Sequence, residues 1–161
     1  MKKSTSQFMY CKVEPRPKTD DGYFEQMAKT VFRSGFNWSV IESKWPDIQK
    51  SFANFSVKKV ARFNDSDIDR LMKDKGVVRN YRKIAAVIEN AKKMEKVEEE
   101  YGSFRDYLKK VGKDGEQKLC KSVVKQFSYI GDSMVVSFLR SVGEEMPEMN
   151  KVWMKKHASG P

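Results

Sequence analysis

The chain has 161 residues, of which 39% are hydrophobic and 34% charged, and its formal net charge is +10. This length suits one domain with its own core, and the 12% aromatic content excludes a disordered chain. No apolar run approaches the roughly 20 residues of a membrane span, and the start, MKKSTSQFMYCK, lacks a signal peptide's apolar segment. We therefore expect a cytoplasmic protein without a membrane partner.

The excess of lysine and arginine attracts polyanions, so it is compatible with nucleic-acid binding and equally with a merely soluble surface. Cys11, Cys120 and His157 lack the spacing of a zinc site. We expect two reduced thiols, no bound metal and no cofactor.

Apolar residues recur at helical spacing from Asp20 to Phe138, which predicts an all-α fold. The first helix is expected over residues 22–34, with Asp20 or Asp21 capping it and Gly35 at its C-terminal turn.

A short second helix is expected to begin after Asn37 and to carry Trp38. Pro46 suits the first turn of a separate third helix that ends near Phe52. Asn64 and Asp65 then precede a helix that runs through Lys73.

A longer helix is predicted over residues 80–100, with apolar side chains on one face and lysines and arginines on the other. Ser103 begins the next helix, and residues 112–115 form a surface loop. Two further helices are expected over residues 116–127 and 132–142.

The tight segment 128–131 between those two helices can direct backbone N–H groups at a phosphate, and Gly131 permits close approach. Gly131 is equally compatible with an ordinary corner between helices. Beyond it, Pro147 opens a possible last helix through Trp153. The expected organisation is an N-terminal extension over 1–19, a helical domain over 20–143 and a tail over 144–161.

Several motifs follow one another in a recognisable order. They are DDGYFEQM, FRSGFNW, FANFSVKKVARFNDSDIDRLMKDKGVVRNYRKIAAVIENAKK, YGSFRDYL and FSYIGDSMVVSFLRSVG. In these segments the chain resembles the type I 3-methyladenine DNA glycosylases of the helix-hairpin-helix superfamily. The resemblance implies a helical bundle with a cleft, binding of double-stranded DNA by a monomer, and extrusion and hydrolytic release of an alkylated purine.

The resemblance also implies roles for individual residues. Trp38 matches the tryptophan that stacks on the extruded base, and Phe36 and Tyr10 are its possible neighbours; core packing is the alternative role for Trp38. A positively charged base suits an aromatic face and leaves readily, so strong acid catalysis is unnecessary. The residues expected along the DNA backbone are Tyr129, Gly131, Ser133, Lys121, Lys125, Arg79, Arg82 and Lys83. Water would be the nucleophile.

Other positions depart from the family pattern. Its base-binding glutamate falls on Thr30, which offers a hydroxyl without charge; Glu42, one turn after Trp38, is a possible substitute and otherwise a surface residue. The zinc ligands of the family are replaced, so the resemblance predicts no zinc. Asp132 stands where proline is common and is expected to cap the following helix while repelling phosphate. Glu144, Glu145 and Glu148 are interpreted as an acidic run without a catalytic role.

Two other functions remain compatible with these departures. One is a catalytically inactive DNA-binding protein of the same fold. The other is a helical module whose basic face binds an acidic protein.

Overall fold

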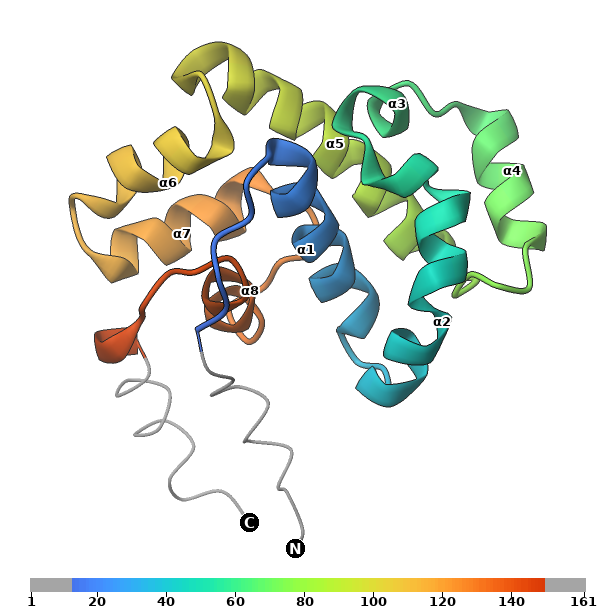
Figure 1. Cartoon of the computed structure of the whole chain (residues 1–161), viewed down its shortest axis with the longest axis horizontal. Helices are drawn as coiled ribbons and strands as arrows, with labels where there is room; N and C mark the ends of the chain where they lie inside the picture. The colour runs from blue at the N-terminus through green and yellow to red at the C-terminus, as the bar shows by residue number, and fades with distance from the viewer. Residues whose placement is uncertain (1–12, 150–161) are drawn as a thin grey trace, which may run out of the picture.

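The computed structural model describes residues 13–149, and every regular element in that range is a helix (Figure 1). The elements are α1 Asp20–Arg33, α2 Trp38–Ser51, the 3₁₀ turn η2 Ala53–Phe55, α3 Val57–Ala61, α4 Asp65–Lys73, α5 Tyr81–Tyr101, α6 Phe104–Gly112, α7 Glu116–Gln126 and α8 Val135–Ser141. The all-α prediction is confirmed. No helix within this range is both long and apolar enough to cross a membrane.

The long helix α5 packs against α1, α3, α4 and α6 (Figure 1). Its predicted apolar face is buried, with Ile84, Val87, Ala91 and Met94 all at 0% exposure. Ile84, Val87 and Met94 each contribute about 1.5–3 kcal/mol when they leave water, so this one stripe holds several helices together. Asn80 caps α5, its side chain accepting from the N–H of Lys83.

The helix α2 is continuous through Pro46, so the prediction of two separate helices is wrong. Proline within a helix leaves the carbonyl of the residue four positions earlier without its partner, at a cost of about 3 kcal/mol. Ile41, Trp45 and Ile48 lie on one face of α2 and are buried, which offsets that cost. One uninterrupted helix therefore carries both Trp38 and Glu42.

The connection after α2 contains a left-handed turn that the sequence does not signal. Ala53, Asn54 and Phe55 have φ of 53°, 54° and 56° without a glycine among them, a backbone that disfavours L-residues. The turn allows the Phe52 and Phe55 rings to stack with centroids 5.4 Å apart, both fully buried. Aromatic packing thus maintains the strained backbone.

The N-terminus of α1 is capped differently from the prediction. The Thr19 hydroxyl accepts from the N–H of Gly22 over 3.1 Å. Asp20 and Asp21 lie inside the first turn, and their carboxylates accept from other helices, at the N–H of Phe104 in α6 and of Val57 in α3. The first turn of α1 therefore joins the N-termini of two other helices.

Candidate functional site

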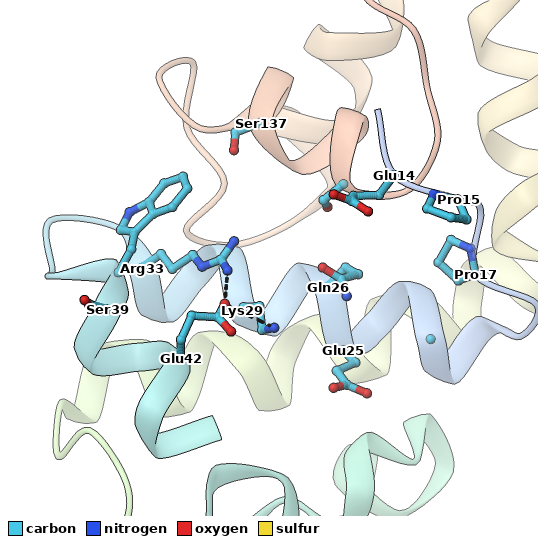
Figure 2. A pocket seen from close by; sticks show the side chains of 13 residues that line it. Glu14, Pro15, Pro17, Glu25, Gln26, Lys29, Arg33, Ser39, Glu42 and Ser137 are labelled. Carbon is cyan, nitrogen blue, oxygen red and sulfur yellow. Dashed lines mark hydrogen bonds and ion pairs between the residues drawn. The ribbon is translucent and has the colours of Figure 1, made fainter. Parts of the chain in front are cut away.

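A cavity of about 670 Å³ opens between α1, the start of α2, α8 and the segment that precedes α1. Residues Glu14, Pro15, Pro17, Gly22, Glu25, Gln26, Lys29, Arg33, Trp38, Ser39, Glu42, Ser137 and Ser141 line it. Figure 2 shows Lys29 and Arg33 extending from α1 toward Glu42 on α2, with Ser137 of α8 facing them across the opening. Its volume is in the range of small-molecule sites.

Trp38, the first residue of α2, is half-buried in the wall of this cavity. The side chain of Asn37 accepts from the N–H of Ser39 over 2.9 Å and fixes the direction in which the helix begins. The guanidinium carbon of Arg33 lies 4.7 Å from the centroid of the Trp38 ring, which is the geometry of a cation–π contact. The indole of Trp38 is therefore part of the cavity wall and already attracts the positive charge of Arg33.

Glu42 supplies a carboxylate to the same wall, one turn after Trp38. It pairs with the Arg33 guanidinium and, over 3.3 Å, with the Lys29 ammonium. Burial alone raises the pKa of this carboxyl, but the two cations outweigh burial and lower the pKa below its ordinary value. Glu42 is therefore ionised at neutral pH.

Sequence reasoning missed three charged residues of α1 that line the cavity: Glu25, Lys29 and Arg33. Glu25 accepts from Nε1 of Trp45 and Nε2 of Gln49, each over 2.8 Å. A pattern in the sequence could have identified them, because charged residues recur every four positions on the side of α1 opposite its apolar stripe.

The structure argues against Thr30 as a group that contacts the base. Thr30 is 5% exposed, does not line the cavity, and donates its hydroxyl hydrogen to the carbonyl of Gln26 over 2.9 Å. Position 30 lies on the buried stripe of α1, so its side chain is committed to the helix and the core.

Phe36, one of the two predicted neighbours of Trp38, is not in the cavity wall. Phe36 lies in the connection between α1 and α2 with 43% of its surface exposed, and the Lys83 ammonium lies 5.6 Å from the centroid of its ring. Tyr10 lies outside the described residues. Trp38 is thus the only member of the predicted base-binding set within residues 13–149 that lines the cavity.

Lys83 has a different role from the predicted contact with DNA. It is 5% exposed, and its ammonium donates to the carbonyls of Phe32 over 3.2 Å and Ser34 over 2.5 Å, at the C-terminal end of α1. Burial lowers the pKa of this amine. Arg79 and Arg82, by contrast, are exposed at the start of α5.

The predicted hairpin is formed by α7, residues 127–134 and α8. Asn90 of α5 fixes the hairpin: its amide donates to the carbonyl of Ser128 over 2.9 Å and accepts from the N–H of Ser128 over 2.7 Å. Tyr129 follows with φ of 64° and is 42% exposed. Ser137 and Ser141 of α8, the second helix of the hairpin, line the cavity.

One detail of the hairpin differs from the prediction. Helix α8 begins at Val135 and its N-cap is Met134, with no capping side chain, so Asp132 does not cap it. The φ of Gly131 lies outside the left-handed region, and a Cβ added there would meet no protein atom within 4 Å. Gly131, Ser133, Lys121 and Lys125 are exposed.

Comparison with known proteins agrees with this geometry. A family model described as methyladenine glycosylase matches residues 14–128, more than half of the chain. The chain is 28% identical over 139 residues to a DNA-3-methyladenine glycosylase of Haemophilus influenzae, covering 74% of this chain and 75% of that protein. It is 30% identical over 93 residues to DNA-3-methyladenine glycosylase 1 of Escherichia coli K12, covering 57% of this chain and 50% of that protein.

A solved structure shares the fold. A glutamate-to-glutamine mutant of 3-methyladenine DNA glycosylase I from Staphylococcus aureus superposes with a TM-score of 0.72 at 25% identity, over 86% of this chain and 84% of that one. The helical bundle, the cavity beside Trp38 and the family match lead to the same assignment. The chain belongs to the methyladenine glycosylase family.

Proposed function

We propose that this protein is a base-excision repair glycosylase that hydrolyses the N-glycosidic bond of alkylated purines, 3-methyladenine above all, in double-stranded DNA. One observation carries the proposal: Trp38 and Glu42 lie one turn apart on α2 and line one cavity, which α8 closes on another side. The match to the methyladenine glycosylase family supports the same reaction.

The cavity offers a positively charged base both contacts that it needs. The indole of Trp38 attracts a cation to its face, and ionised Glu42 accepts hydrogen bonds and balances charge. In this proposal Glu42 provides the carboxylate that Thr30 cannot. A methylated base bearing positive charge is a good leaving group, so binding and orientation supply much of the catalysis and water is the nucleophile.

The DNA strand would lie along the hairpin. The carbonyl of Gly131 accepts from the N–H groups of Met134 and Val135, each over 3.0 Å, so these two N–H groups already have a partner. We therefore expect a phosphate to contact backbone N–H groups that precede Met134 in the hairpin. The empty space at Gly131 supports close approach of a strand. Tyr129, Ser133, Lys121 and Lys125 would flank that phosphate, and Arg79 and Arg82 would contact the backbone further along. One chain supplies every group in this proposal, so we expect a monomer; a DNA repair role fits a place in the cytoplasm, with the DNA.

Excision from a duplex with a single 3-methyladenine tests the proposal. Trp38→Ala should abolish base release, and Glu42→Gln should slow it by about 10- to 100-fold, because a charged hydrogen bond of about 1.5–3 kcal/mol is lost. Ser39→Ala, which lines the same cavity without offering an aromatic face or a charge, is the matched control and should retain the wild-type rate.

A catalytically inactive DNA-binding protein is the second candidate, and one observation favours it. The Arg33 guanidinium already covers the face of Trp38 and pairs with Glu42. Wild-type protein that binds the damaged duplex without releasing the base would establish this function in place of the first.

A further inference from the structure

Arg33 contacts both groups that the proposed function assigns to the base. Its guanidinium carbon is 4.7 Å from the Trp38 ring centroid, and Nη2 of the same guanidinium bonds to Oε1 of Glu42. The Arg33 side chain lines the cavity and is 19% exposed. A planar cation between an indole and a carboxylate has the chemistry of the expected ligand.

We infer that Arg33 is an intramolecular competitor for the base site, which covers the indole when no base is bound and must move aside before one enters. This inference rests on the proposed function, because it takes Trp38 and Glu42 as the base-binding pair. It adds that a residue of this chain, Arg33, sets the affinity of the site.

Two features make the guanidinium displaceable. Nε of Arg33 is buried and has no hydrogen-bond partner in the described part of the chain, so its N–H regains a partner once it reaches water. Glu42 keeps the Lys29 ammonium at 3.3 Å when Arg33 leaves, so the carboxylate is not stranded without a counter-charge. Movement of Arg33 therefore leaves no buried charge unpaired.

Lys29 provides a matched control for the effect of charge. It carries the same charge as Arg33, lies on the same helix and pairs with the same Glu42, but its ammonium lies over the Trp45 ring at 5.0 Å and not over Trp38. Lys29→Gln therefore removes a positive charge from the cavity and leaves the Trp38 face covered. Arg33→Gln removes a positive charge and uncovers that face.

Two nucleosides separate these effects. 7-Methylguanosine carries a net positive charge at a pH low enough to keep its N1 protonated, and guanosine is the neutral nucleoside that lacks the methyl group. We expect Arg33→Gln to bind both more tightly than wild type, by roughly five- to thirtyfold, the strength of one cation–π contact. Lys29→Gln should tighten only the charged nucleoside.

The experiment titrates wild type, Arg33→Gln and Lys29→Gln with each nucleoside by calorimetry, with Arg33→Ala replacing the glutamine variant if that variant does not fold. Unchanged or weaker guanosine binding by Arg33→Gln overturns the inference. So does an equal gain in guanosine affinity for Lys29→Gln, because the effect would then be charge alone.

A measurement without ligand keeps this inference separate from the proposed function. Acrylamide quenching of Trp38, taken as the difference between each protein and its Trp38→Phe variant, should increase in Arg33→Gln and stay at the wild-type level in Lys29→Gln. Equal quenching in all three proteins overturns the inference. If quenching increases in Arg33→Gln but the wild-type protein releases no base, the inference about Arg33 stands and the proposed glycosylase activity is rejected.

Discussion

The carboxylate of Asp20 accepts a hydrogen bond from the backbone N–H of Phe104 over 3.0 Å, although 84 positions separate the two residues. Its neighbour Asp21 accepts from the N–H of Val57 over 2.9 Å in the same way. Amides in the first turn of a helix have no partner within the helix, and a carboxylate near them is favoured by the helix dipole. The turn that starts α1 thus sets the positions of α6 and α3, and α1 in turn forms one wall of the cavity.

We expect Asp20→Ala to lower the free energy of unfolding by about 1–3 kcal/mol, because the N–H of Phe104 loses its partner in a part-buried position. Asp20→Asn keeps an acceptor oxygen at the same place and should cost clearly less. Urea denaturation of both variants measures the difference. An alanine variant as stable as the asparagine variant would show that the hydrogen bond contributes nothing.

The pH dependence of stability should reveal the cost of charge at Asp20. Burial raises the pKa of Asp20 above 3.8, the hydrogen bond from Phe104 acts in the opposite direction, and the charges of Asp21 and Asp106 raise it further. The folded protein then binds this proton more tightly than the unfolded chain, so stability falls as pH rises from 3.8 through the raised pKa. Asp20→Asn lacks this loss.

As the pH rises from 3.8 through the raised pKa of Asp20, wild type should therefore lose unfolding free energy relative to Asp20→Asn. Glu98 strengthens the trend: burial and then the Asp20 charge raise the pKa of Glu98, and the variant removes that charge. Urea denaturation at a series of pH values checks the prediction. A difference that is constant with pH contradicts it.

The parts of the fold that local signals determine could be predicted from the sequence. The apolar face of α5 is set by residues close in the chain, and its prediction is confirmed. Pro46 and the left-handed turn at Asn54 could not be predicted, because burial of Trp45 and Phe55 in the core overrides the local preference there. Tertiary packing decides such positions.

The candidate site shows the same division. Helical spacing correctly suggested that Glu42 lies one turn from Trp38 on the same helix. The approach of Arg33 to Trp38 depends on how α1 and α2 cross after the turn at Gly35, which has φ of 66°, and no local pattern encodes that crossing. The burial of Lys83 against α1 is likewise a consequence of packing.

Lys83 and Arg82 are adjacent in sequence but should respond to mutation in different ways. Lys83→Met removes the donor from the carbonyls of Phe32 and Ser34, so we expect the free energy of unfolding to fall by about 1–3 kcal/mol. Arg82→Gln should leave stability unchanged. It should reduce the steepness of log affinity against log salt concentration by about 0.9, because one contact with a DNA phosphate is lost. Urea denaturation and duplex binding between low and high salt separate the two. A reduced salt slope in Lys83→Met would restore Lys83 to the DNA interface.

Cys120 should be chemically inert in the folded protein. It is 5% exposed, and burial, followed by the charges of Glu116 and Asp132, raises the pKa of its thiol from 9.0 to about 12. The reactive thiolate is then about a thousandfold rarer than in an ordinary cysteine. In a Cys11→Ser background, a thiol reagent at pH 8 should label the protein in urea and leave it unlabelled under native conditions. Rapid native labelling would mean that α7 opens readily.

Gly131 and Gly143 form a pair that separates a role in binding from a role in folding. A Cβ on Gly131 meets no protein atom within 4 Å and its φ is ordinary, so Gly131→Ala should change stability by less than about 0.5 kcal/mol. If a DNA strand approaches the hairpin there, the added methyl group intrudes on that strand, and duplex affinity should fall about tenfold or more.

Gly143 has φ of 90°, and a Cβ there would lie 2.5 Å from Cγ of Arg16 and 3.1 Å from the backbone nitrogen of Arg16. Gly143→Ala should therefore destabilise the fold by more than about 1 kcal/mol, while any protein that remains folded binds duplex with wild-type affinity. Thermal unfolding and fluorescence anisotropy on both variants give the four values needed. Wild-type duplex affinity in Gly131→Ala would remove the hairpin from the DNA interface, because nothing within the described protein requires glycine at that position.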